Sequence, residues 1–172
     1  KEESCGYARD AVSRLLRGQN IDFYLAMSLD GISVLNDLAG GVTVTLEDDF
    51  SAADPAMTKG TTLTLHGDQA EIFVRRRMDI GEGTNEARMV RQEEYLAQLS
   101  AQLESSVQQD QQFTAQVYDA LQPYLVTDLA KGQLVNEVWA AKDDTVEPAI
   151  ALEGEHKVAE DGFTEFYPTE AS

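Results

Sequence analysis

Five arginines gather within seventeen residues of the chain: Arg75, Arg76, Arg77, Arg88 and Arg91. A guanidinium group stays charged at any physiological pH and can bind two phosphate oxygens at once. Several such groups directed at one point would repel each other unless an anion neutralised them. The clustering therefore predicts an anion site, and a pyrophosphate, which carries two or three negative charges, is its natural ligand.

The spacing of the arginines places them on two neighbouring elements. Arg75 and Arg77 come at the end of an expected helix, whereas Arg88 and Arg91 lie three residues apart on the next one and share a face, which Gln92 continues. The start of the second helix adds free backbone N–H groups and a partial positive charge beside Arg88. A glycine-bearing turn between the elements could bring both pairs together.

Surface ion pairs are the alternative interpretation of these arginines, because Asp79, Glu82 and Glu86 lie close by in the sequence. The chain as a whole is strongly acidic, with a net charge of −18, of which −13 falls on residues 92–172. Such a charge repels nucleic acid and anionic lipid at long range. A nucleic-acid partner is therefore not expected.

Other chemistry has little support in the sequence. His66 and His156 stand alone, without metal-ligand spacing, and the single Cys5 has no partner for an internal disulfide. The acidic pairs at 48–49 and 143–144 are typical of solvated turns. No stretch is apolar enough to cross a membrane. We predict no catalytic residue and no metal ligand in this segment.

The elements that must position the arginines follow from hydrophobic spacing. Residues 68–75 are expected to be helical, and residues 79–85 form a glycine-bearing mobile loop. Thr84 or Asn85 is expected to cap the following helix, whose apolar stripe consists of Leu96, Leu99 and Leu103.

The remaining elements alternate between helix and strand. Before the arginines we expect a helix over 7–17 with Gly18 at its end, a strand over 21–29, a helix capped by Asp30, a strand over 42–46 after a Gly40-Gly41 turn, and a loop over 47–60. After them we expect a helix over 111–121 and another after Thr127 that buries Leu134, Val135, Val138 and Trp139. Strand-like pieces at 149–152 and 162–167 are separated by Gly154 and charged residues. This order predicts an α/β fold with a mixed β-sheet sandwiched between helices, as a single domain over 1–172.

The arginine motifs also carry a family resemblance. Residues 73–77 (Phe-Val-Arg-Arg-Arg), preceded by residues 65–70, resemble the Leu-x-Gly-x-x-Ala-Leu-x-Tyr-Val-Arg-x-Arg segment of the LytR-CpsA-Psr family. Residues 88–92 resemble its Arg-x-x-Arg-Gln helix. Residues 21–24 and 38–44 are similar to its Ile-Asp-Tyr-Tyr and Leu-Gly-Gly-Val-x-Val strands. Residues 152–155 and 166–168 resemble its closing stretch, so the likeness covers nearly all of the chain and the C-terminal two-thirds of the family domain.

The resemblance implies a phosphotransferase of the cell envelope that moves glycopolymers from a polyprenyl-pyrophosphate carrier to peptidoglycan. By motif position, Arg75, Arg77, Arg88 and Arg91 would hold the pyrophosphate, with Gln92 supporting them. The lipid tail would lie in an apolar slot. The expected location is the extracytoplasmic face of the bacterial membrane, with the anchor outside this segment. The alternative is a non-catalytic module that binds polyisoprenyl phosphate or acts as an envelope scaffold.

The chain also departs from the family pattern. The family's N-terminal strands, whose aspartates help to bind Mg²⁺, have no counterpart here, and Asn85 stands where the family often has an aspartate. Glu71 replaces the usual leucine after Ala70. Mg²⁺ is therefore expected only for the complete family domain, with ligands outside this segment. The segment alone is expected to bind weakly and to be inactive.

Overall fold

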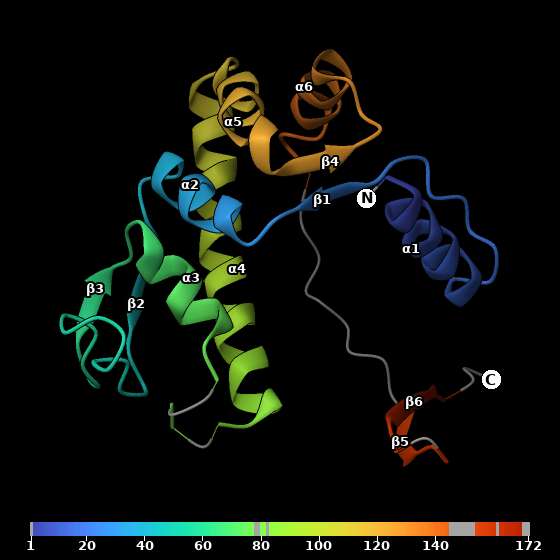
Figure 1. The fold of residues 1–172 in the computed structure, drawn as a ribbon. Helices are drawn as coiled ribbons and strands as arrows, with labels where there is room; N and C mark the ends of the chain where they lie inside the picture. Colours follow the sequence, from blue (N-terminus) through green and yellow to red (C-terminus); the bar gives the residue numbers. More distant parts are fainter. Residues whose placement is uncertain (1, 78–79, 82, 145–153, 161, 170–172) are drawn as a thin grey trace. The chain divides into compact units, whose positions relative to one another are not determined.

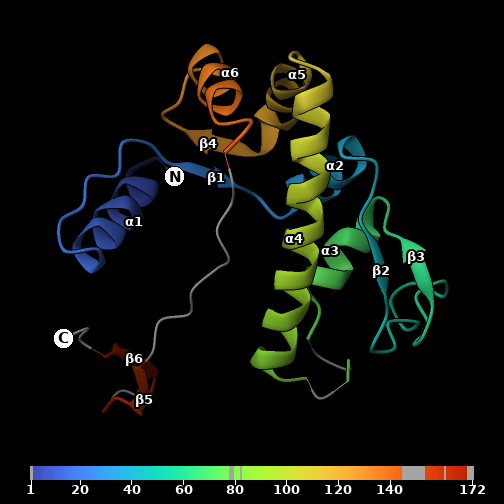
Figure 2. The same ribbon diagram turned by 180° about the vertical axis from the view of Figure 1, so that it is seen from behind.

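The computed structural model describes residues 2–77, 80–81, 83–144, 154–160 and 162–169. These residues group into two compact units, Lys1–Lys142 and Asp143–Ser172, which are described separately below. Figures 1 and 2 show the elements from opposite sides.

The first unit begins with helix α1 (Glu2–Leu15), which has no buried residue. Strand β1 (Leu25–Met27) follows and pairs antiparallel with β4 (Leu125–Thr127), so that Leu25 lies opposite Thr127. The predicted strand over 21–29 is therefore much shorter than expected. The reason is that its partner β4 has only three residues, and a strand cannot extend beyond the backbone with which it pairs.

Helix α2 (Asp30–Leu38) confirms the short helix but not its predicted cap. Leu29 occupies the capping position without a side-chain hydrogen bond, and Asp30 is already the first helical residue. The turn at Gly40-Gly41 is confirmed, with φ values of +89° and +85° that favour glycine. A Cβ at Gly41 would also overlap the side chains of Thr64 and His66. The chain must therefore have no side chain where it turns into the next strand.

Strands β2 (Thr43–Thr45) and β3 (Thr62–Thr64) form an antiparallel pair. Their threonine hydroxyls hydrogen bond across the pair at 2.8 Å, Thr43 with Thr64 and Thr45 with Thr62. Val44, between the two threonines of β2, is buried, which is the alternation of a strand with one face on the core. The predicted loop over 47–60 is confirmed.

Helix α3 (Asp68–Arg75) has the bounds that the sequence predicts. Helix α4 (Asn85–Gln109) is capped by Thr84, whose side chain accepts a hydrogen bond of 3.1 Å from the backbone N–H of Ala87. Its predicted apolar stripe is only partly in the core. Leu99 is buried and Leu103 packs against the buried cluster, but Leu96 is 57% exposed.

Three further elements complete the first unit. Helix α5 (Phe113–Leu121) confirms the predicted helix within two residues, and a 3-10 turn, η1 (Gln122–Tyr124), leads into β4. Helix α6 (Lys131–Ala140) is also confirmed, but it has no buried residue. The four side chains predicted to be buried there are half-buried, because α6 packs mainly against α5 and leaves its other faces open.

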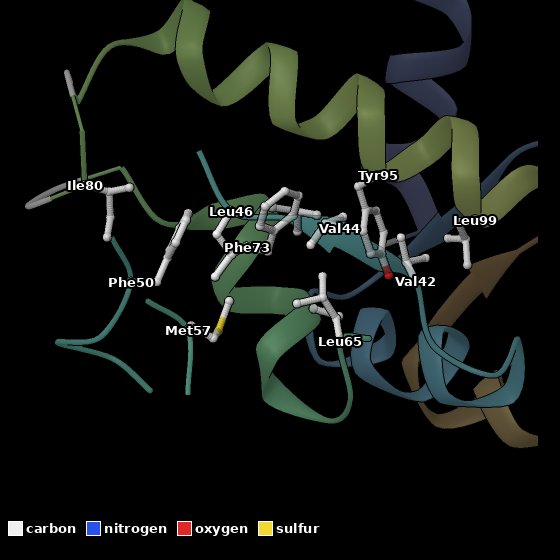
Figure 3. Close-up of a cluster of buried hydrophobic side chains, with 12 residues drawn as sticks. Val42, Val44, Leu46, Phe50, Met57, Leu65, Phe73, Ile80, Tyr95 and Leu99 are labelled. Atoms are coloured by element: carbon white, nitrogen blue, oxygen red, sulfur yellow. The ribbon is translucent and has the colours of Figure 1, made fainter. Parts of the chain in front are cut away.

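The core of the first unit is formed by buried side chains of β2, α3 and α4, and the two helices pack against each other (Figures 1 and 2). Figure 3 shows Tyr95 and Leu99 projecting from α4 toward Val42 and Val44, with Phe73 of α3 in the same cluster. Asn36 is fully buried beside this cluster. Its side chain donates to the carbonyl of Leu65 at 2.6 Å and accepts from the N–H of Val42 at 3.1 Å. The amide therefore joins α2 to the residues next to β2 and β3 and satisfies the buried backbone groups there.

The second unit contains a hairpin of β5 (Gly154–Val158) and β6 (Thr164–Pro168). Strand β6 confirms part of the predicted 162–167 piece, whereas the piece at 149–152 and the motif residues 152 and 153 lie outside the described residues. Strand β5 was not predicted, because its glycine and charged residues indicated a break. The α/β class is confirmed. The strands of the described ranges pair in three separate antiparallel sheets instead of one mixed sheet.

Candidate functional site

The end of α3 positions the first three arginines. Phe73 and Val74 are buried against the core, which anchors the last turn of the helix. The backbone becomes extended at Arg76, with φ −67° and ψ 134°. The side chains of Arg75, Arg76 and Arg77 are exposed at this point, where the helix ends and the chain leaves it.

The first turns of α4 position Arg88, which is half-buried. The segment between the two arginine groups includes Gly81 and Gly83, both with positive φ. The residues at 78–79 and 82 lie outside the described ranges, so the predicted loop is described only in part.

A cavity of about 880 Å³ lies where these two elements meet. It is lined by Asp68, Glu71, Ile72, Arg75, Arg76, Arg77 and Arg88. The fold thus brings together Arg75, Arg77 and Arg88, three of the arginines that the sequence predicts to act together. It adds Arg76, which the motif did not single out and which lies where the chain leaves the helix.

Arg91 was expected on the same face as Arg88, but it is directed elsewhere. Only 7% of the residue is exposed, and it is not among the residues that line the cavity. Its Nη1 lies 3.2 Å from Oδ2 of Asp48, and its Nη2 donates to the main-chain carbonyl of Arg76. Its guanidinium carbon lies 5.1 Å from the centre of the Phe50 ring. A separation of three residues rotates the side chain about 60° around the helix, which is enough to turn Arg91 inward.

The electrostatics of Arg91 reflect this position. Burial lowers the pKa of its guanidinium from the ordinary value, and the carboxylate of Asp48 opposes that shift. The positive charge of Arg88 lowers the pKa of Arg91 slightly further. An arginine nevertheless remains protonated, because its ordinary pKa lies far above neutrality.

Gln92 also faces inward from α4. Its side-chain amide donates a hydrogen bond of 2.9 Å to the carbonyl of Val74, in the last turn of α3. Gln92 does not line the arginine cavity but contributes to a neighbouring apolar pocket. The ligand roles predicted for Arg91 and Gln92 stay predictions, although neither side chain borders the cavity.

Two carboxylates share the arginine cavity, and sequence reasoning gave neither of them a role there. Glu71 forms an ion pair of 2.8 Å with Arg75, one helical turn away on α3. Asp68 lies on the same face of α3, three residues before Glu71. The spacing of Asp68, Glu71 and Arg75 over two turns is the signal that could have placed all three on one face.

Apolar pockets lie beside the arginine cavity in the same unit. One, of about 290 Å³, is lined by Met27, Ile32, Leu35, Val74, Gln92, Tyr95, Leu96 and Leu99. A second, of about 310 Å³, shares Met27 and Leu35 with the first and is otherwise bordered mostly by α4, α5, β4 and α6. The exposed Leu96 thus lines a pocket that the core does not fill.

The described ranges contain neither a metal-binding cluster nor a membrane-spanning helix. No group of three or more histidine, cysteine, aspartate or glutamate side chains there is arranged to hold a metal ion. No helix in the same residues has both the length and the apolar character that crossing a membrane would require.

Comparison with solved structures supports this fold. Protein gbs0355 from Streptococcus agalactiae is 22% identical, with a TM-score of 0.74 over 95% of this chain and 57% of that one. TagV from B. subtilis is 18% identical, with a TM-score of 0.63 over 94% of this chain and 63% of that one. TagT bound to LI-WTA is 18% identical, with a TM-score of 0.67 over 94% and 60%. The chain therefore spans 57% to 63% of the length of these three structures.

Among curated protein sequences, none matches the chain. The sequence profile of the LytR_cpsA_psr family, in contrast, matches residues 5–169. This match includes both arginine motifs and every described helix and strand from β1 to β6. The chain thus belongs to the LytR-CpsA-Psr family.

Proposed function

We propose that this chain supplies the pyrophosphate-binding part of a cell-envelope phosphotransferase. The enzyme would transfer a glycopolymer from a polyprenyl-pyrophosphate carrier to peptidoglycan. Membership of the LytR-CpsA-Psr family supports the general activity. The structural observation that carries the proposal is the gathering of four arginines around one cavity.

The charge of the cavity suits a pyrophosphate. Arg75, Arg76, Arg77 and Arg88 contribute four positive charges, and Glu71 and Asp68 contribute two negative ones. The balance of two positive charges matches a diphosphate diester, which carries two negative charges. Arginine donors can hold such oxygens in pairs, and they stabilise the charge that develops on phosphoryl oxygens in the transition state.

The apolar pockets suit the lipid part of the same carrier. Val74 and Ile72 are close together on α3, yet Val74 lines an apolar pocket whereas Ile72 lines the arginine cavity. On α4, Arg88 likewise lines the arginine cavity, whereas Gln92 lines the apolar pocket. The two helices therefore present a charged cavity and an apolar pocket near one another, as an amphiphile with an anionic head requires.

In the proposed reaction, a peptidoglycan hydroxyl oxygen attacks the phosphorus atom that bears the glycan. A new P–O bond forms, the bond to the bridging oxygen of the pyrophosphate breaks, and polyprenyl phosphate leaves with the bond electrons. The hydroxyl proton passes to a base. The arginines neutralise the phosphoryl oxygens during this step, and we assign the base to none of the described residues.

The described residues do not fit a resident Mg²⁺ ion. The arginine cavity offers two carboxylates, but Glu71 is paired with Arg75 and four guanidinium groups surround the site. A cation would be repelled there in the absence of a phosphate ligand. We propose that Mg²⁺, if the complete domain uses it, takes its ligands outside this segment, and we derive no step through it.

We further propose that the enzyme acts at the extracytoplasmic face of the bacterial membrane, where a polyprenyl-linked glycan and peptidoglycan would meet. The similar structure of TagT was determined bound to LI-WTA. That ligand supports a substrate of the same kind for this chain.

The proposal is tested by titrating inorganic pyrophosphate and farnesyl pyrophosphate into the full-length protein by calorimetry. Arg75→Ala and Arg88→Ala should each weaken binding about 10-fold, since each removes charge-assisted hydrogen bonds. Arg14→Ala, which removes an exposed arginine of α1 outside the cavity, is the matched control and should bind like the unaltered protein. Equal affinity in all four proteins would overturn the proposal.

A non-catalytic lipid-phosphate-binding module is the second candidate. Asn85, at a position where the family often has an aspartate, favours this reading, because an amide cannot accept a proton as a base. Release of polyprenyl phosphate from a lipid-linked glycan in the presence of peptidoglycan would distinguish the candidates. Binding without release by the full-length protein would support the module.

A further inference from the structure

The end of α3 needs hydrogen-bond partners that the helix itself cannot provide. The last carbonyls of any helix have no N–H four residues further on. The chain becomes extended at Arg76, so the carbonyl of Val74 and that of Arg76 must be satisfied from elsewhere. Consecutive residues of α4 do this: Gln92 donates to Val74 and Arg91 donates to Arg76.

Arg91 is also held from its other side. Asp48 and Phe50 both lie in the segment after β2, and they contact the guanidinium through an ion pair of 3.2 Å and through the face of the ring. Arg91 therefore links three segments: the β2–β3 connection, the exit of α3 and helix α4. All of these contacts are made in a site where only 9% of the side chain is exposed.

Asp48 contacts the connection between the two arginine groups as well. Gly81 has φ +49°, and a Cβ there would overlap the carboxylate of Asp48. The carboxylate thus lies against the backbone of the segment that leads from Arg77 to Arg88. One acidic side chain consequently contacts both Arg91 and the turn that joins the two sides of the cavity.

We propose that Arg91 is a positioning residue and does not contact the anion. Asp48 and Gln92 act with it to hold the end of α3. The role of Arg91 is to hold the carbonyl of Arg76, and so to direct Arg75, Arg76 and Arg77 into the cavity. Its charge is neutralised by Asp48, and its position is away from the cavity lining. This inference rests on the proposed anion site but assigns Arg91 a different role from the one that the family motif implies.

Asp48→Asn provides a test in which the two roles predict opposite signs. If Arg91 were a ligand, removing the acid would free its charge and strengthen the binding of inorganic pyrophosphate. If Arg91 positions the arginines, the loss of its anchor weakens binding, and we expect a reduction of about 5-fold in the full-length protein. Asp49→Asn is the matched control, since it removes the same charge from an exposed neighbour that hydrogen bonds to Ser51. It should leave the affinity unchanged or slightly increased.

A second pair of variants covers the case in which Asp48→Asn does not fold. Gln92→Ala removes the bond to Val74, whereas Gln102→Ala removes a similar bond of 2.8 Å from the same helix to the carbonyl of Gly41, outside the cavity. In the ligand-free protein, the amide NMR signals of residues 74–77 should shift in Gln92→Ala and not in Gln102→Ala. Pyrophosphate affinity should fall 3- to 10-fold in the first variant alone.

The arginine side-chain NMR signals provide the direct readout. On adding inorganic pyrophosphate, the Nε–H signals of Arg75 and Arg88 should shift with saturation, and that of Arg91 should stay in place. A saturable shift of Arg91 as large as that of Arg88, or tighter binding by Asp48→Asn, would overturn the positioning role. No binding by the unaltered protein would instead overturn the proposed function, and the ligand-free comparison of Gln92→Ala with Gln102→Ala would still test the positioning of residues 74–77.

Discussion

The carboxylate of Asp48 lies 3.2 Å from the guanidinium of Arg91, and only 9% of the Arg91 side chain and 22% of the Asp48 side chain are exposed. Ion pairs in such positions are weak evidence for stability, because desolvation offsets much of the attraction. Removing one partner, however, leaves an uncompensated buried charge. The pair therefore fixes where Arg91 is directed, and this separates it from the arginines that line the cavity.

The anion site should bind more tightly when Glu71 is neutralised. Glu71 pairs with Arg75 at 2.8 Å inside the arginine cavity and so competes with any anion for that guanidinium. Glu71→Gln should increase the affinity for inorganic pyrophosphate about 3- to 10-fold in calorimetric titrations. Glu104→Gln, an exposed position on α4 outside the cavity, is the control. Unchanged affinity in Glu71→Gln would show that its carboxylate does not compete for Arg75.

Filling the apolar pockets should separate lipid binding from head-group binding. Leu35 lines both pockets, so Leu35→Trp should reduce the affinity for farnesyl pyrophosphate at least 10-fold. The affinity for inorganic pyrophosphate should stay the same, because Leu35 does not line the arginine cavity. Leu38→Trp, on the same helix but outside both pockets, is the matched control. An equal loss of affinity for both ligands would mean that the apolar pockets do not bind the lipid separately from the head group.

The buried amide of Asn36 should contribute strongly to stability. Asn36→Leu is close to isosteric, but it would leave the N–H of Val42 and the carbonyl of Leu65 without the partners they have now. Each unsatisfied buried group costs about 1–3 kcal/mol, so we expect the free energy of unfolding to fall by about 2–6 kcal/mol. Urea unfolding measures this change. Asn136→Leu, at an exposed position of α6, should change the value by less than about 0.5 kcal/mol.

Tyr95 should make stability depend on alkaline pH. Burial, with a further effect of the Asp37 charge, raises the pKa of its hydroxyl from 10.0 to about 12 in the folded state. The folded state thus holds this proton more tightly than the unfolded state does. The contribution is present in full below pH 10 and is lost as the pH rises to about 12. Between pH 8 and pH 11 the loss should be about 1.4 kcal/mol.

Comparison with Tyr95→Phe isolates this contribution. The variant lacks the titrating hydroxyl and its hydrogen bond of 3.2 Å to Asn36, so it should be less stable at pH 8 but decline less between pH 8 and pH 11. Urea unfolding of both proteins at the two pH values gives the difference. Parallel declines would mean that the hydroxyl does not titrate as its burial implies.

The sequence alone determined the local structure around the site. Helix α3 was predicted with its observed bounds, because Asp68 to Arg75 follows a glycine and combines apolar with charged residues. The sequence also predicted the Gly40-Gly41 turn and restricted the cap of α4 to Thr84 or Asn85, since both features depend on residue types at one place in the chain. The gathering of Arg75, Arg77 and Arg88 followed from the short distance between the two helices along the sequence.

Only the tertiary structure decided which arginines share the cavity. Arg88 and Arg91 are indistinguishable by spacing, but Asp48, Phe50 and the carbonyl of Arg76 come from other segments and draw Arg91 inward. The partial burial of the α4 stripe and the shortness of β1 depend in the same way on what packs beside them. Local patterns reflect the interactions of a residue with its own helix or strand. The direction of a side chain at a junction depends on partners that lie far away in the sequence, and only folding brings those partners within reach.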